Sequence, residues 1–135
     1  MRTLEFTLFS IYVKTIKQHV EKDMTVYIVQ EMRGRDISDA SSFGDLEICI
    51  PAKDQSVYST QPFLRILSRK LSKFSDKDFL LLSGDPVAIA LAGAVASRSN
   101  MGKMKMLKWD RLENTYYPLA VDLNNGLYTE EIKHG

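Results

Sequence analysis

The tetrapeptide Ser83-Gly84-Asp85-Pro86 has residue types that suit either anion binding or the start of a helix. It follows an apolar run and precedes an Ala-rich stretch, which is typical of a strand-to-helix junction. The first N–H groups of such a helix are unpaired and attract anions. Asp85 can accept those N–H groups itself, and Pro86 supplies no donor, so the residue types favour a structural cap. Ser83, Gly84 and Asp85 are the ligand-binding candidates.

A second group combines bases with an aromatic ring near the C-terminal end of the chain. Its members are Lys103, Lys105, Lys108, Trp109 and Arg111. An exposed basic and aromatic hairpin can bind single-stranded nucleic acid, so these residues are candidates for contacting nucleic acid or another partner. On a strand, however, Lys103 and Lys105 share one face and Lys108 lies on the other. The alternative, which the spacing favours, is an edge strand whose lysines discourage edge pairing.

Other reactive side chains lack the neighbours that catalysis or metal binding needs. Cys49 is the only cysteine and lies in an apolar run, so we expect a buried, inert thiol. His19 and His134 are far apart, with no ligand spacing between them. Asp76 and Asp78 are interpreted as solvated loop residues. Dinucleotide and P-loop fingerprints are absent. We therefore name no catalytic residue, metal ligand or cofactor, and an enzymatic activity is not favoured.

The elements that would position these residues alternate between strands and helices. Strands are predicted at 25–30, 46–50 and 79–82, helices from Ser59 or Thr60 to 74 and at 86–99, and a C-terminal hairpin at 103–109 and 116–123. Residues 33–45 are predicted to form a loop. The fold class is therefore α/β, with a mixed sheet, two strand–helix–strand crossovers and an antiparallel C-terminal hairpin.

The composition is that of one globular domain with no overall charge bias. The 135 residues include 18 Lys and Arg against 17 Asp and Glu, and the formal net charge is +1. Residues 61–111 nevertheless hold ten bases against four acids, while the rest holds eight bases against thirteen acids. No apolar stretch is long enough to cross a membrane, and no secretory signal is recognised, so we expect no membrane partner.

Three motifs together resemble a family of small, uncharacterised proteins encoded by tailed bacteriophages. They are the stretch 78–90 with its GDPVAIA helix start, the KMLKWDR of 105–111 and the YYPL of 116–119. The resemblance covers about residues 24–123 and implies a phage protein in the host bacterial cytoplasm, with a place in the virion as the alternative. It assigns no catalytic residue.

The resemblance also suggests how the chain is organised. Residues 1–23 have no counterpart in the family and are expected to be an N-terminal strand and connector or an appendage. Residues 24–123 would form the α/β domain, and residues 124–135 a C-terminal turn and tail.

These observations lead to a phage accessory protein that acts by binding, with protein or nucleic acid as its partner. The alternative is a binder of a small molecule, nucleotide or phosphate, with or without enzymatic activity, at the turn 83–86. A third hypothesis is a structural component of the virion that assembles as a homo-oligomer.

Overall fold

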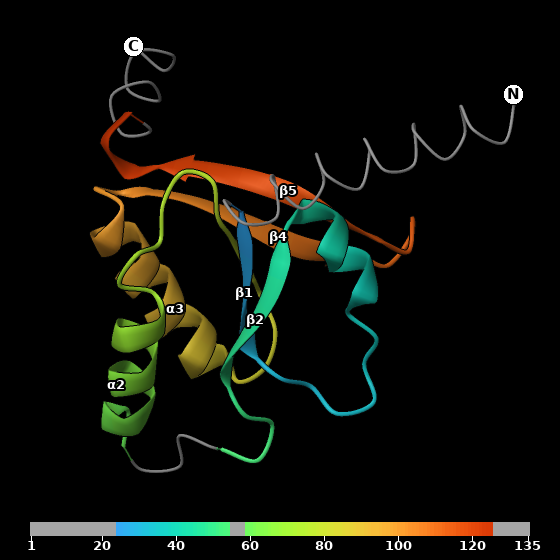
Figure 1. The fold of residues 1–135 in the computed structure, drawn as a ribbon, viewed down its shortest axis with the longest axis horizontal. Coiled ribbons are helices and arrows are strands. Elements are labelled where there is room, and N and C mark those ends of the chain that lie inside the picture. The colour runs from blue at the N-terminus through green and yellow to red at the C-terminus, as the bar shows by residue number, and fades with distance from the viewer. Residues whose placement is uncertain (1–23, 55–58, 126–135) are drawn as a thin grey trace, which may run out of the picture.

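The computed structural model describes residues 24–54 and 59–125. A five-stranded sheet lies at its centre, with α2 and α3 on one side and the short helix η1 on the other (Figure 1). The elements are β1 (Thr25–Gln30), η1 (Ser38–Phe43), β2 (Asp45–Ile50), α2 (Gln61–Lys70), β3 (Phe79–Leu81), α3 (Pro86–Ser99), β4 (Lys103–Asp110) and β5 (Thr115–Asp122). The predicted α/β class with a mixed sheet is confirmed.

The strand order β2-β1-β3-β4-β5 explains why the two faces of the sheet are covered unequally. The first four strands are parallel, and β5 pairs antiparallel with β4. The crossovers through α2 and α3 step in the same direction across the sheet, so right-handed connections place both helices on one face. The connection from β1 to β2 steps the other way and carries η1 to the opposite face. We call these the helix face and the η1 face.

Alternating strand residues divide the core between these two faces. On the helix face, Tyr27, Val29 and Leu80 pack against the buried side chains of α2 and α3. On the η1 face, Val26 and Ile28 pack in a smaller cluster with residues of β3, β4, β5 and η1. Among the described residues, the η1 face is therefore covered by the six-residue helix η1, whereas α2 and α3 cover the helix face.

Both principal helices begin as the sequence predicts, but α2 is shorter than expected. Asp85 caps α3 by accepting the Val87 N–H at 2.9 Å, and Pro86 occupies the first turn. α2 ends at Lys70, although the apolar spacing continues to Phe74. Phe74 still reaches the core because a non-helical turn, closed by its N–H on the carbonyl of Leu71, returns it there.

Two expectations about loops are wrong. Residues 33–45 contain η1, whose Ala40 is fully buried against the sheet. Asp78 is not solvated: it is 5% exposed, and its carboxylate accepts the N–H groups of Thr25 at 3.0 Å and Ser75 at 2.9 Å. The carboxylate thus joins the start of β1 to the turn before β3, and its burial is supported by these bonds.

Candidate functional site

The turn between β3 and α3 is held closed by hydrogen bonds to the end of β1. The Ser83 hydroxyl donates to the carbonyl of Gln30 at 2.7 Å, and the Asp85 N–H donates to Gln30 Oε1 at 2.8 Å. Gly84 has a φ of +99°, a conformation that L side chains rarely adopt. The Val87 N–H donates to the Asp85 side chain, and Pro86 has no N–H. The N–H groups of Asp85 and Val87 are therefore used within the protein and are not offered to an anion.

Gln30 lies at the carboxyl end of β1 and fills the place where an α/β fold usually binds a ligand. The chain leaves β1 toward one edge of the sheet and leaves β3 toward the other, and ligands collect at the carboxyl ends of such a strand pair. Here Gln30 is 4% exposed, and its Nε2 donates to the carbonyls of Pro51 at 3.2 Å and Asp54 at 2.6 Å. A ligand role for Ser83, Gly84 and Asp85 stays a prediction, and it requires Gln30 to move.

Gln30 is the residue that sequence reasoning missed at this turn. The available signal was an amide ending the otherwise apolar run Val26 to Val29. A buried amide needs several partners, and those of Gln30 come from the loop after β2 and the turn after β3, which only the fold brings together.

The structure separates the five candidates of the basic hairpin. Lys103 and Lys105 lie on the η1 face with Leu107 and Trp109, whereas Lys108 lies on the helix face, as predicted from the strand alternation. Trp109 is partly buried and meets Tyr116 edge-on, with ring centroids 4.9 Å apart. Arg111 is exposed in the turn between β4 and β5. The hairpin therefore has no single basic and aromatic stripe.

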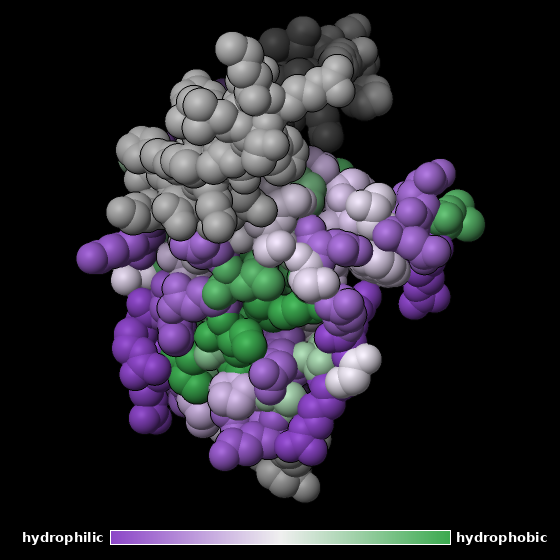
Figure 2. Space-filling model, turned by 45° about the vertical axis from the view of Figure 1, so that its right-hand side comes forward, coloured by the Kyte–Doolittle hydropathy of each residue, from purple (hydrophilic) through white to green (hydrophobic). Residues whose placement is uncertain are grey.

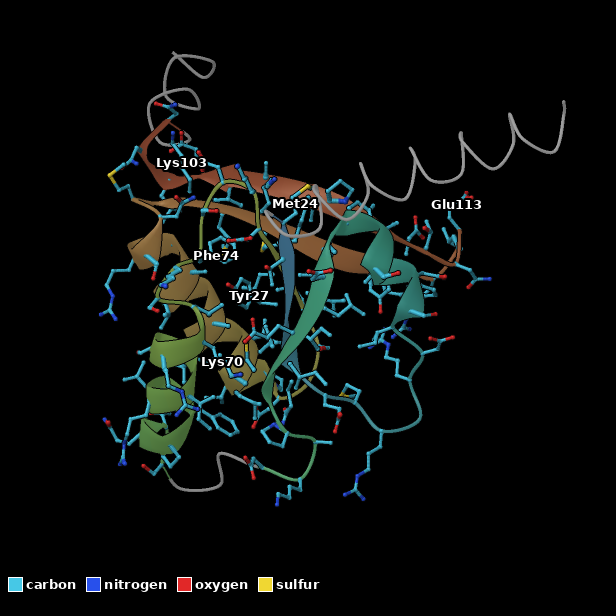
Figure 3. All side chains as sticks on the ribbon, in the orientation of Figure 1. Met24, Tyr27, Lys70, Phe74, Lys103 and Glu113 are labelled. Atoms are coloured by element: carbon cyan, nitrogen blue, oxygen red, sulfur yellow. The ribbon has the colours of Figure 1, made fainter. Side chains whose placement is uncertain are left out.

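Lys103 and Lys105 do meet at a cavity of about 380 Å³ beside the first residues of β4. In Figure 3, Lys103 stands at the opposite end of the hairpin from Glu113. Lys105 extends across the η1 face, where its Nζ lies 4.2 Å from the centre of the Phe79 ring. The position of this cavity depends on strand lengths and register, which the residue pattern did not reveal.

On β2, the outermost strand of the sheet, apolar side chains are exposed on the η1 face. Leu46 and Ile48 of β2 pair with Val26 and Ile28, so they point to the η1 face, and they are 37% and 38% exposed. Met32, in the loop after β1, is 43% exposed. Figure 2 shows a hydrophobic patch surrounded by hydrophilic residues in this view of the molecule. We call Leu46 and Ile48 the β2 patch.

Charge is also divided between the parts of the molecule. Residues 61–73 and 86–99, which include α2 and α3, hold five bases and no acid: Arg65, Arg69, Lys70, Lys73 and Arg98. Residues 24–54, which include β1, η1 and β2, hold six acids against three bases. Lys70 and Glu47 link the two regions by an ion pair of 3.2 Å. The basic excess predicted for residues 61–111 is therefore divided between the α2 and α3 stretches and the β4–β5 hairpin.

Two buried groups outside these surfaces, Cys49 and Tyr116, have raised pKa values. Burial raises the pKa of the Cys49 thiol to about 12, helped by the nearby Glu47 carboxylate. Burial likewise raises the pKa of Tyr116, whose hydroxyl has no hydrogen-bond partner in the part of the chain that the structure describes. His19 and His134 fall outside the described ranges.

Within residues 24–54 and 59–125, no three His, Cys, Asp or Glu side chains are grouped for a metal ion. No helix in these ranges is long and apolar enough to span a membrane.

Comparison with known proteins identifies a family. The family model described as Phage Pam3 gp32-like protein matches residues 24–123. The chain therefore belongs to the Phage Pam3 gp32-like family, which agrees with the phage setting implied by its motifs. No curated protein and no solved structure matches the chain.

Proposed function

We propose that this phage-family protein acts by binding protein, and that the partner docked on the β2 patch is a second copy of the same chain. The exposed pair Leu46 and Ile48 carries the proposal. The outer edge of β2 pairs with no other strand among the described residues, so backbone donors and acceptors accompany the apolar side chains there.

A complementary surface on the same molecule supports a second copy as the occupant. The groove between α2 and α3 is lined by Leu64, Leu91, Ala94, Val95 and Arg98. It lies between the basic helices, whereas the β2 patch belongs to residues 24–54, which hold six acids against three bases. Surfaces of opposite charge attract each other and set the orientation of docking.

The two surfaces lie on opposite faces of the sheet, so they cannot meet within one molecule. The contact between copies would therefore be head-to-tail, with the β2 patch of one copy on the helices of the next. Repeated contacts of this kind close into a ring or extend as a filament. Binding of nucleic acid to the hairpin is disfavoured for a separate reason: Lys103 and Lys105 point to one face of the sheet and Lys108 points to the other.

The proposal is tested by light scattering after size exclusion at increasing concentrations of the full chain. We expect the mass to rise above that of the monomer. Leu46→Asp should weaken association at least about tenfold, because a carboxylate would lose its water in an apolar contact.

Leu112→Asp is the matched control, since Leu112 is 93% exposed in the turn between β4 and β5. It should associate like the unmodified chain. A monomer at every concentration, or equal association of the Leu46 and Leu112 variants, would refute the proposal.

A further inference from the structure

The cavity at the start of β4 is formed by a mismatch in strand length. β3 has only three residues, and its pairing with β4 begins at Met106. The first residues of β4 therefore extend past β3 while remaining paired with the end of β5. The space beside them is about 380 Å³, within the size range of small-molecule pockets. Its lining includes Asp76, Asn100, Lys103, Lys105, Ala120 and Asp122.

The two lysines are available to an anion. Among the described residues, neither Lys103 nor Lys105 has a carboxylate within ion-pair distance, and Lys105 instead lies over the Phe79 ring. Asp122 is committed to its own turn, because it accepts the N–H groups of Asn124 at 3.0 Å and Asn125 at 3.3 Å and the Asn125 side-chain amide at 2.9 Å. Two ammonium groups with no carboxylate partner suit the oxygens of a phosphate.

Asp76 adds a second requirement for the ligand. Its Oδ1 accepts the Asn100 amide at 2.8 Å, whereas its Oδ2 has no partner among the described residues. That oxygen can accept an N–H donor from a ligand, and Ala120 offers an apolar surface between the charged groups. A phosphate alone would be small for this cavity and would leave Asp76 facing an anion.

We propose that this cavity binds a nucleoside monophosphate, with the phosphate on Lys103 and Lys105 and a donor group of the base on Asp76. The site uses neither the β2 patch nor the helix groove, so it is independent of the proposed self-association. It is also separate from the turn at residues 83–86, where Gln30 occupies the space.

The test is an NMR titration of the isotope-labelled full chain with each of the four nucleoside 5′-monophosphates. We expect at least one of them to shift the amides of residues 103–105 and 120–122. It should bind at least about tenfold more tightly than its nucleoside or inorganic phosphate alone, since each supplies only half of the contacts.

Substitutions then assign the contacts. Lys103→Met should weaken nucleotide binding at least about tenfold, because a charged hydrogen bond is lost. Lys108→Met, on the other sheet face, is the matched control and should change binding less than about twofold. Asp76→Asn keeps an acceptor for Asn100 and removes a charge, so it should weaken nucleotide binding and leave phosphate binding no weaker.

Three results would overturn the proposal. One is that no monophosphate shifts residues 103–105 and 120–122. Another is equal binding by the Lys103 and Lys108 variants. The third is tighter, strongly salt-dependent binding of an oligonucleotide than of any monophosphate, which would indicate a nucleic-acid surface instead.

Discussion

The thiol of Cys49 is chemically quiet because of where β2 places it. It is 4% exposed on the helix face, and the loss of water around it disfavours the thiolate. Its pKa of about 12 lies above the ordinary value of 9.0, so the folded chain holds the proton over a pH range in which the unfolded chain releases it.

This difference in pKa predicts how stability depends on pH at one residue. Because the folded pKa is raised, the contribution of the thiol is fully present below about pH 9 and is lost as the pH rises toward about 12. Urea unfolding of the unmodified chain and of Cys49→Ala, compared across this range, should therefore show a stability difference that shrinks with increasing pH.

The control for this experiment is Ile28→Val, which shortens a buried side chain that does not titrate. Its stability difference from the unmodified chain should stay constant across the same range. A constant difference for Cys49→Ala as well would contradict the assigned pKa.

Among the elements, the junction of β1, β3 and α3 depends on one glycine. A Cβ at Gly84 would lie 2.3 Å from the Cβ of Gln30, and the φ of +99° would add backbone strain. Gly84→Ala should therefore lower the free energy of unfolding by at least about 2 kcal/mol, since Gln30 cannot withdraw without losing three hydrogen bonds.

Gly93→Ala in α3 is the matched substitution. There the nearest atoms to an added Cβ are those of Met104, at 3.9 Å, and the backbone is helical. The substitution should raise stability by about 0.5 to 1 kcal/mol, because alanine restricts the unfolded chain more than glycine does. Urea unfolding measures both, and an equal loss in the two variants would contradict the role given to Gly84.

Most elements are predictable from the sequence because their signals are local. The β-branched run at 25–30, the Asp85-Pro86 helix start and the antiparallel pairing of the two hairpin strands all depend on neighbouring residues. The 3-10 helix η1 was missed because its sequence, SDASSF, is polar and only Ala40 is buried. The early end of α2 was missed because Phe74 satisfies the apolar spacing from a turn.

The candidate sites were less predictable because they join distant segments. The alternation on β4 was enough to separate Lys108 from Lys103 and Lys105. No local pattern showed that Gln30 would fill the turn at 83–86, or that β3 would be short enough to open a cavity beside Lys103.

Across the whole molecule, the division of charge and the two apolar surfaces, the β2 patch and the groove between α2 and α3, together suit contact between copies. The balanced composition concealed this division of charge, because the basic helices and the acidic β1–η1–β2 region cancel in the sum. What the sequence could not reveal is that the β2 patch and the groove between α2 and α3 lie on opposite faces of one sheet, which is the condition for head-to-tail contact between copies.

The most direct test of this head-to-tail contact mixes two variants, each altered on one surface. Leu46→Asp alters the β2 patch, and the double substitution Arg65→Glu with Arg69→Glu alters the exposed bases of α2. Arg111→Glu, in the distant hairpin turn, controls for charge reversal and should self-associate normally.

Sedimentation velocity should show each altered variant alone as a monomer. An equimolar mixture should form a one-to-one dimer and nothing larger, because one intact surface remains on each chain. Two variants that stay monomeric when mixed, or an α2 variant that still self-associates, would contradict the account.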